Sequence, residues 1–279
     1  MWLKDQEIHM AFFTHGQHRH YYYDAGAGSP VLLLHGLGNS GRAWIPQVGA
    51  LLGLGHRVIV SDLLGHGASS EAPEGITAHT QALEMLALLD HLGLDSTHLI
   101  GLSLGGMVAL EMACHAPQAV QKLVVAGTFV NMNTAHRQGM LDDWAAGLQQ
   151  TDGCLKRFKS TWPALVGADF ADSARGQRLY QAWHAQAAQL SAQDQIRWCN
   201  GMKHFDVSNQ LPLIQAATLV LAAERDCISP RSEAEEISLR IAHARQVTLA
   251  GDGHVFNISH AHAFNQAIGA FLQERPHDA

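Results

Sequence analysis

Ser103 stands in a sequence pattern that is typical of a nucleophile. The residues Gly101-Leu102-Ser103-Leu104-Gly105 follow an apolar, β-rich run and precede a helical pattern, which predicts a sharp strand-to-helix turn. A side chain on such a turn has a strained backbone, and the small residues Gly101 and Gly105 would let the turn close without clashes. The hydroxyl of Ser103 would then lie at the positive end of the following helix. The pattern therefore predicts Ser103 as a nucleophile for acyl transfer.

A serine hydroxyl needs a base to take its proton and an acid to orient that base. We predict His254 as the base, because it follows a predicted strand in a glycine-containing loop. The nearby His260 and His262 are interpreted as capping or surface groups. Asp226 is the predicted acid, since it lies just past the end of a strand, where open α/β sheets bind their ligands. Glu224, two residues earlier, is a weaker candidate for the same role.

Acyl transfer also requires hydrogen-bond donors for the oxyanion that forms on the carbonyl oxygen. The backbone N–H of Leu104, directly after the nucleophile, is one predicted donor. The N–H of Leu37 is the other, because it lies in the glycine-rich loop His35–Ser40 between a strand and a helix. The turn 62–67 also follows a strand, and we interpret it as shaping the body of the protein.

Metal and disulfide chemistry are not predicted. His15, His18 and His20 have a spacing that could hold a metal ion, but they fall on a predicted edge hairpin, and we interpret them as exposed surface residues. The four cysteines have no paired spacing, so reduced thiols are expected.

The composition limits the kinds of partner that this protein is expected to bind. The chain has 279 residues, 47% of them hydrophobic, with 18 Lys and Arg against 25 Asp and Glu and a net charge of −7. This charge excludes nucleic acid as an expected partner, since binding it requires many cations against phosphates. The first ten residues lack the apolar core of a signal peptide, and no stretch is long and apolar enough for a membrane span. We therefore expect a cytoplasmic protein that binds no membrane.

Strand and helix patterns alternate along most of the chain, which predicts a parallel sheet covered on both faces. A hairpin from Glu7 to Tyr23 is expected to extend one edge. The predicted strands are Pro30–His35, Arg57–Ser61, His98–Leu102, Lys122–Ala126, Thr218–Ala222 and Gln246–Leu249. The predicted helices are Gly41–Leu52, Thr77–Leu92, Leu104–His115, Ser232–Ala242 and Ala261–Gln273.

The alternation stops between Val130 and Pro212. This segment has helical patterns and many aromatic residues, and it is too long for a loop inside a compact domain. We interpret residues 130–212 as an inserted helical cap over an apolar-walled pocket, and residues 1–129 and 213–279 as the α/β core. Despite the net negative charge, Arg137, Lys156 or Arg157 of this cap could offset the charge of an anionic substrate.

The motifs together resemble the α/β-hydrolase superfamily. H-G-L-G at His35–Gly38, D-x-x-G-H-G at Asp62–Gly67, G-L-S-L-G-G at Gly101–Gly106, the Asp226 loop and Gly253-His254 occur in the order that is usual there. The resemblance implies an eight-stranded sheet with one antiparallel strand, a lid after the sixth strand, and no cofactor. Within the superfamily, the stretch Gly101–Leu110 is similar to 3-oxoadipate enol-lactonase and related small esterases and lactonases.

The expected activity is that of a cofactor-independent serine hydrolase, acting on a carboxylic ester or lactone through an acyl-enzyme. Hydrolysis of C–C bonds in aromatic degradation, thioesterase activity and perhydrolase activity on the same residues remain alternatives. A hydrolase-fold protein that binds a small ligand without turnover is a further one. The oligomeric state is left open between monomer and homodimer.

Overall fold

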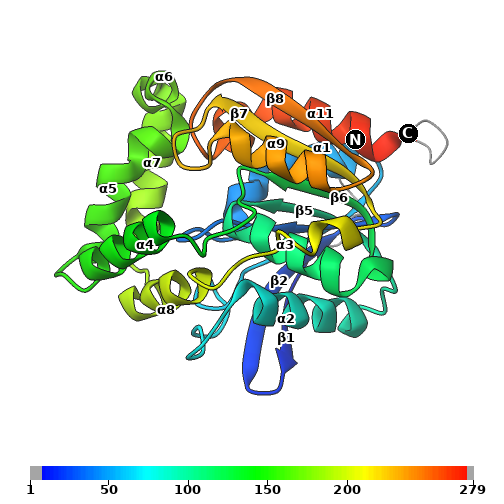
Figure 1. Ribbon diagram of the computed structural model, residues 1–279, viewed down its shortest axis with the longest axis horizontal. Helices are drawn as coiled ribbons and strands as arrows, with labels where there is room; N and C mark the ends of the chain where they lie inside the picture. Colours follow the sequence, from blue (N-terminus) through cyan, green and yellow to red (C-terminus); the bar gives the residue numbers. More distant parts are fainter. Residues whose placement is uncertain (1–7, 275–279) are drawn as a thin grey trace.

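An eight-stranded sheet forms the centre of the molecule. The computed structural model describes residues 8–274, and the first residue of the predicted hairpin, Glu7, lies outside this range. The strands are β1 (Ile8–His15), β2 (His18–Ala25), β3 (Pro30–Leu34), β4 (Arg57–Ser61), β5 (Thr97–Leu102), β6 (Val120–Ala126), β7 (Ala217–Arg225) and β8 (Ala244–Asp252). Their order in the sheet is β1-β2-β4-β3-β5-β6-β7-β8. The expected eight-stranded, mostly parallel sheet is confirmed (Figure 1).

Within the described sheet, β2 alone runs antiparallel to its neighbours, β1 and β4. All other neighbouring pairs are parallel. β7 and β8 are longer than the apolar runs that predict them, because their pairing continues through small and polar residues to Arg225 and Asp252. The apolar pattern detects only the buried middle of these strands.

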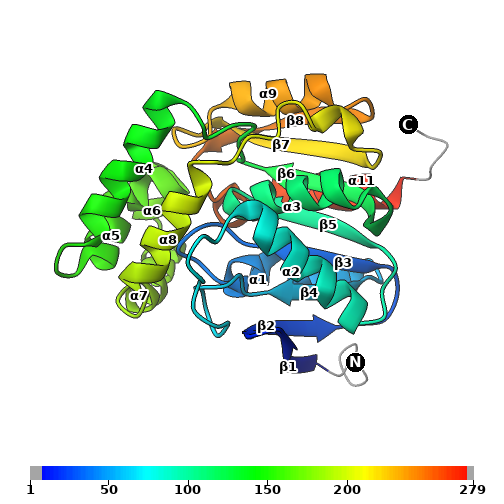
Figure 2. The same ribbon diagram turned by 60° about the horizontal axis from the view of Figure 1, so that its bottom comes forward.

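Helices cover both faces of the sheet. They are α1 (Ile45–Gly53), α2 (Ala78–His91), α3 (Leu104–His115), α9 (Arg231–Arg240), α10 (Phe256–Ser259) and α11 (Ala261–Gln273). α1 and α11 contact each other on one face, whereas α2, α3 and α9 lie on the opposite face (Figures 1 and 2). Successive residues of β3 alternate between the two cores, Val31 and Leu33 on the α1 side and Leu32 and Leu34 on the α2 side. Burying each of these side chains contributes roughly 1.5–3 kcal/mol.

One predicted helix is divided in the structure. The pattern predicts a continuous helix over Gly41–Leu52, but the chain forms a short 3₁₀ turn at Gly41–Trp44 and then α1 from Ile45. Pro46 is the physical reason, because it has no N–H to donate to the carbonyl one turn earlier and its ring crowds that carbonyl. The change brings Trp44 into the core, where it is fully buried.

Five helices lie between β6 and β7. They are α4 (Ala135–Leu148), α5 (Gly153–Val166), α6 (Ala168–Asp172), α7 (Ala174–Ala187) and α8 (Ala192–Met202). We call residues 130–212 the helical segment. Its two ends run side by side, since Asn131 and Asp206 form an isolated antiparallel bridge. Figures 1 and 2 show the helical segment at one end of the molecule, beside the end of the sheet.

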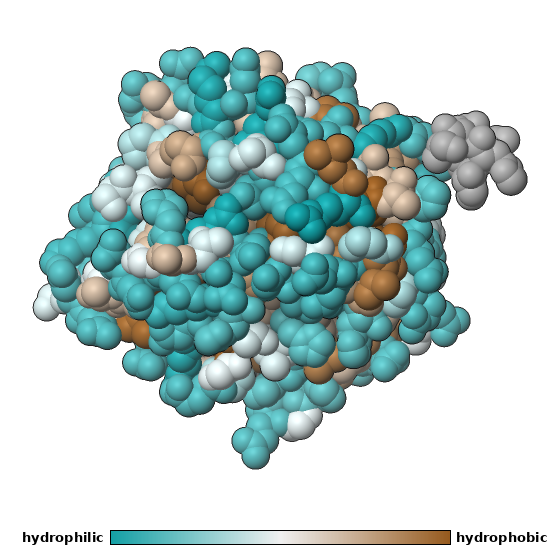
Figure 3. Space-filling model, in the orientation of Figure 1, coloured by the Kyte–Doolittle hydropathy of each residue, from teal (hydrophilic) through white to brown (hydrophobic). Residues whose placement is uncertain are grey.

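The surface is mainly hydrophilic in the view of Figure 3, with hydrophobic side chains in small, separate areas. Among residues 8–274, no helix combines the length and the apolar character needed to cross a bilayer.

Candidate active site

Ser103 lies on a strained turn between β5 and α3. Its φ of 56° and ψ of −117° place a non-glycine residue in a sparsely populated conformation, which costs roughly 1–3 kcal/mol. Two hydrogen bonds hold this conformation: the N–H of Ser103 donates to the carbonyl of Ala126 (2.9 Å), and its carbonyl accepts from the side-chain Oγ1 of Thr128 (2.8 Å). A Cβ on Gly101 would lie 2.2 Å from the carbonyl oxygen of Gly105, and one on Gly105 would lie 2.1 Å from that of Leu34. Only glycine fits at both positions.

His254 and Asp226 form a buried pair. The ring Nδ1 of His254 lies 2.8 Å from Oδ2 of Asp226, and their side chains are 5% and 0% exposed. The other carboxylate oxygen, Oδ1, accepts hydrogen bonds from the backbone N–H groups of Ile228 (2.8 Å) and Ser229 (3.0 Å). The carboxylate is therefore held from two sides, and it fixes the orientation of the imidazole.

The loop that carries His254 is anchored on α5. The N–H groups of His254 and Val255 donate to the carbonyls of Ala164 (3.1 Å) and Leu165 (2.7 Å). These carbonyls belong to the last turn of α5, where no later helical N–H is left to bind them. Gly253 makes the close approach possible, since its φ is 92° and a Cβ on it would lie 2.5 Å from the carbonyl carbon of Val166.

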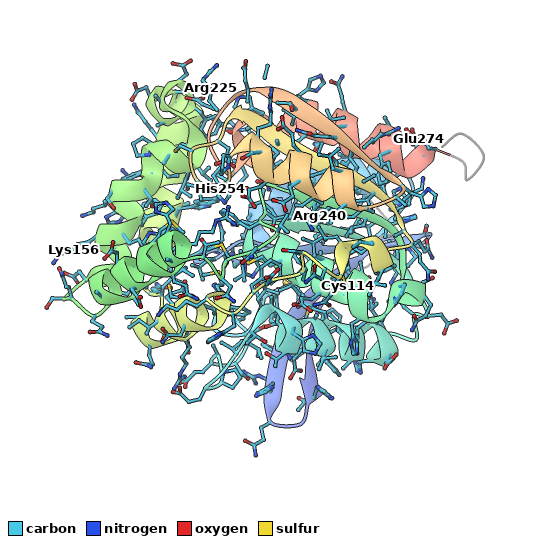
Figure 4. All side chains as sticks on the ribbon, in the orientation of Figure 1. Cys114, Lys156, Arg225, Arg240, His254 and Glu274 are labelled. Carbon is cyan, nitrogen blue, oxygen red and sulfur yellow. The ribbon has the colours of Figure 1, made fainter. Side chains whose placement is uncertain are left out.

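Ser103, His254, Leu37 and Leu104 all line one pocket of about 160 Å³ between the sheet and the helical segment. Asp226 lies behind His254, outside the lining. Figure 4 shows His254 between the strands and the helical segment. Within the described residues, no hydrogen bond joins Ser103 Oγ to His254. This contact is often long in an empty site and shortens when substrate binds.

Two neutral histidines shape the loop that carries Leu37. His66 Nε2 accepts from the N–H of Gly38 (3.0 Å), and His35 Nε2 accepts from the N–H of Leu63 (3.1 Å). Burial lowers the pKa of His35 to about 4 and the pKa of His66 to about 3. Both rings therefore stay uncharged near neutral pH, as an accepting nitrogen must. Sequence reasoning missed this role, although both residues stand in its glycine motifs.

Asp62 joins the same loop to the next turn. Its Oδ1 accepts from the N–H of Gly41 (2.7 Å) and its Oδ2 from the N–H of Ala68 (2.9 Å). Burial raises the pKa of Asp62, while these hydrogen bonds act in the opposite direction. A Cβ on Gly67 would lie 1.9 Å from this carboxylate, so the turn needs glycine there. The turn 62–67 thus holds the body together and also supports the pocket wall.

The rival candidates lie elsewhere. Glu224 is exposed and pairs with Arg225 (3.3 Å). His260 takes the N-cap position of α11, one of the two roles expected for it, although its side chain makes no capping hydrogen bond and contacts Ser259 Oγ (2.9 Å) instead. His262 is exposed on α11.

The interpretation of His15, His18 and His20 as exposed surface residues is confirmed for His15 and is wrong for His20, while His18 is half-buried. His20 is fully buried, and the side chains of His15 and His18 are 53% and 30% exposed. All three rings contact the carboxylate of Glu84 on α2, at 3.0, 2.7 and 2.9 Å respectively. We call these four residues the hairpin histidine cluster. The sequence could not show it, because the partner lies on a helix far along the chain that packs against β1.

No group of three or more His, Cys, Asp or Glu residues in the described part of the chain is arranged to hold a metal ion. The four cysteines, Cys114, Cys154, Cys199 and Cys227, are all free thiols.

The model of the α/β-hydrolase fold family matches residues 29–261, which is most of the chain. The chain belongs to the α/β-hydrolase family. This α/β hydrolase is 32% identical over 267 residues to a putative non-heme chloroperoxidase of Synechocystis, with 91% of this chain and 94% of the relative covered. It is also 30% identical over 255 residues to the putative carbamate hydrolase RutD of Pseudomonas savastanoi, with 88% and 95% covered.

Solved structures share the fold of this α/β hydrolase. A hydrolase from Pseudomonas aeruginosa superposes with a TM-score of 0.88 at 28% identity, covering 95% of this chain and 98% of the other. An enol-lactonase from Burkholderia xenovorans gives the same TM-score at 22% identity, covering 95% and 100%. At that identity the likeness to the enol-lactonase is one of fold alone.

Proposed function

We propose that this α/β hydrolase is a serine hydrolase that cleaves a small carboxylic ester or lactone through an acyl-enzyme. The observation that carries the proposal is that His254, in a buried pair with Asp226, lines the same pocket as a serine on a strained, glycine-bounded turn. Nucleophile, base and orienting acid are the three groups that acyl transfer by serine requires.

In the first half of the reaction, Ser103 Oγ attacks the substrate carbonyl carbon while its proton passes to Nε2 of His254. The tetrahedral intermediate collapses as His254 returns that proton to the leaving oxygen, and the C–O bond of the ester breaks. In the second half, water loses a proton to His254 and attacks the acyl carbon. The bond to Oγ then breaks, the proton returns to Ser103, and the carboxylic acid leaves.

The backbone N–H groups of Leu104 and Leu37 are the proposed oxyanion donors. Leu104 is the first residue of α3, so its N–H has no partner within the helix and lies at the positive end of the helix dipole. Leu37 lies in the loop that His35 and His66 fix. Donors that are fixed before the reaction stabilise the developing charge without further rearrangement.

The pocket favours a small substrate whose body is largely apolar. Its volume of about 160 Å³ is close to that of a cavity that holds one benzene molecule. Aromatic side chains of the helical segment line it, among them Trp144, Phe158 and Trp183. We therefore assign residues 130–212 as the cap, and residues 1–129 with 213–279 as the core that carries the proposed catalytic residues.

The substitution Ser103→Ala tests the proposal. We expect a loss of turnover of at least about 10⁴-fold on short esters and simple lactones, with an unchanged melting temperature. In the wild-type protein, a fluorophosphonate probe should label Ser103, and mass spectrometry of the tryptic peptide identifies the site. Near-normal hydrolysis by the variant, or an unlabelled Ser103, would contradict the proposal, and the second result would favour a binding protein.

The names of two relatives support further acyl chemistry on the same residues. A perhydrolase would pass the acyl group to hydrogen peroxide instead of water, and the 32% identity to a putative chloroperoxidase favours testing it. Hydrolysis of a carbamate should also be assayed beside that of the esters, because several relatives are named putative carbamate hydrolases. Both assays should lose their signal in Ser103→Ala, since both reactions require the same nucleophile.

A further inference from the structure

Arg157 brings a positive charge into the pocket. It lies on α5, and its side chain lines the cavity together with Ser103 and His254. The guanidinium carbon is 4.3 Å from the ring centroid of Trp144, within the range of a cation–π interaction. A Cβ on Gly38 would lie 3.9 Å from its Nη1, which places the guanidinium beside the loop that carries Leu37.

Nothing in the described protein neutralises this charge. Arg157 makes no ion pair with any residue from 8 to 274, and its buried Nε has no hydrogen-bond partner. No Asp or Glu lines the pocket. The thiols of Cys154 and Cys199 lie near the guanidinium, but burial raises the pKa of Cys154 and raises that of Cys199 to about 11. Both thiols therefore stay uncharged at neutral pH.

The other two cations that could face an anionic substrate are differently placed. Arg137 is paired with Glu233 and with the carbonyl of Asn131. Lys156 is exposed, and Figure 4 shows it at the outer side of the helical segment. Arg157 is thus the free cation of the described pocket lining. Burial lowers its pKa, but a guanidinium stays charged in proteins.

Arg157 is half-buried, and its Nε is shielded from water without a partner. Removing a charged group from water without a partner is unfavourable, so such groups in proteins are usually paired or bind a ligand of opposite charge. A guanidinium presents N–H donors in a planar fork that matches the two oxygens of a carboxylate. The small cavity limits how far such a carboxylate could lie from the carbonyl that Ser103 attacks.

We infer that Arg157 binds a carboxylate of the substrate and makes the enzyme selective for short esters or lactones that carry one acid group. This inference rests on the proposed hydrolase function. Arg157 binds the carboxylate, a part of the substrate that does not react. Ser103 and His254 instead act at the bond that is cleaved. Binding energy from such a remote group lowers KM and orients the carbonyl.

The test compares monomethyl glutarate, which carries one carboxylate, with dimethyl glutarate, in which that charge is removed. Proton release during hydrolysis gives kcat and KM for each ester. We expect the wild-type enzyme to prefer the monoester by about tenfold or more. Arg157→Gln should lower kcat/KM for the monoester by about 10- to 100-fold, mainly through KM, and change the diester by less than about threefold.

Lys156→Gln is the matched control, because it removes one positive charge from the neighbouring residue on the outside of the pocket. It should leave both esters unchanged. Arg157→Lys keeps the charge without the planar fork and should give an intermediate loss, which also covers the case that Arg157→Gln does not fold. Equal effects of these Arg157 variants on both esters, or a wild-type enzyme without preference for the monoester, would overturn the inference.

A binding measurement separates this inference from the proposed function. Calorimetry with glutarate should show binding to the wild-type protein and to Ser103→Ala, weakened at least about tenfold by Arg157→Gln. If neither ester is hydrolysed and Ser103 is not labelled, the hydrolase proposal fails, while glutarate binding that depends on Arg157 still supports the anion site. Absence of glutarate binding in the wild-type protein would overturn the anion site.

Discussion

Two clusters in which imidazole rings meet a buried carboxylate differ in what surrounds them. In one, a single ring, His254, meets Asp226 beside the pocket. In the other, the three rings of the hairpin histidine cluster meet Glu84 between the edge hairpin and α2. The second cluster has more histidines but contacts neither the pocket nor a candidate nucleophile.

Surroundings, rather than pairing with a carboxylate, therefore separate the candidate active-site histidine from the structural ones. Asp226 binds two backbone N–H groups and one ring, which leaves Nε2 of His254 available toward the pocket. Burial alone would raise the pKa of Glu84, but hydrogen bonds from His20, His18 and His15 lower it to about 2. That carboxylate is saturated by its partners and ties β1 and β2 to a helix.

Among the variants that test this comparison, Asp226→Asn should have the largest effect. Asparagine can keep the hydrogen bonds from Ile228 and Ser229, but its amide would donate to Nδ1 of His254 and select the wrong tautomer. We expect kcat to fall by about 10³- to 10⁴-fold with the melting temperature nearly unchanged, measured by ester hydrolysis and circular dichroism. A fall of less than tenfold would mean that the pair does not support catalysis.

Gly253→Ala should have the next largest effect on activity. Its Cβ would collide with the backbone at Val166 and would require φ near 92° for a side-chain residue. The His254 loop must then move away from α5, and we expect kcat/KM to fall by about 10²-fold, because small displacements of a catalytic group are costly. Gly147→Ala is the control, since a Cβ there meets no neighbouring atom. Equal activities of the two variants would show that this contact does not position His254.

Acid should destabilise the pocket loop that His35 and His66 hold and the hairpin histidine cluster in different pH windows. The unfolded chain binds protons on His35 and His66 near their ordinary value of 6.5, whereas the folded protein holds these pKa values at about 4 and 3. The unfolded state therefore binds more protons, and the free energy of unfolding falls as pH drops below about 6.5, by up to about 1.4 kcal/mol per pH unit for each histidine. Glu84 adds a further loss between its ordinary 4.5 and about 2. Urea denaturation from pH 7.5 to 4 measures the upper window, and a flat profile there would contradict the prediction.

Glu84→Gln should have the smallest effect on activity. The variant loses the charged hydrogen bonds to three histidines, and we expect the free energy of unfolding at pH 7 to fall by about 1–3 kcal/mol. The values of kcat and KM should stay within about twofold of the wild type, because the cluster lies outside the pocket lining. A loss of activity comparable to that of Asp226→Asn would contradict the view that the hairpin histidine cluster supports stability alone.

The sequence could predict those parts of the site that depend on residues close to one another along the chain. Ser103, Asp226 and His254 each follow a strand, and the carboxyl ends of parallel strands meet at one edge of a sheet. The glycines around Ser103 mark a tight turn for the same local reason. The strands were predictable as buried apolar runs, but their polar ends at Arg225 and Asp252 were not.

The remaining features depend on residues that are distant in sequence. The carbonyl of Ala164 binds the His254 loop, His66 holds Gly38, and Glu84 collects three histidines. Arg157 has a neighbour of similar charge, Lys156, and only the packing of α5 shows which of them enters the pocket. No pattern within a short window encodes such pairings, because they are fixed by how the helical segment packs on the sheet.

The hydrogen bonds from His254 and Val255 to the end of α5 restrict how this enzyme can be redesigned or diversified. A different set of helices could be grafted between β6 and β7 to accept other substrates, but the graft would have to present two free carbonyls at the same place and allow the close approach of Gly253. Exchange of the whole helical segment would disturb His254, the proposed base, whereas exchange of α7 alone would leave that attachment in place. Diversification of specificity is therefore easier on the side of the pocket that α7 forms.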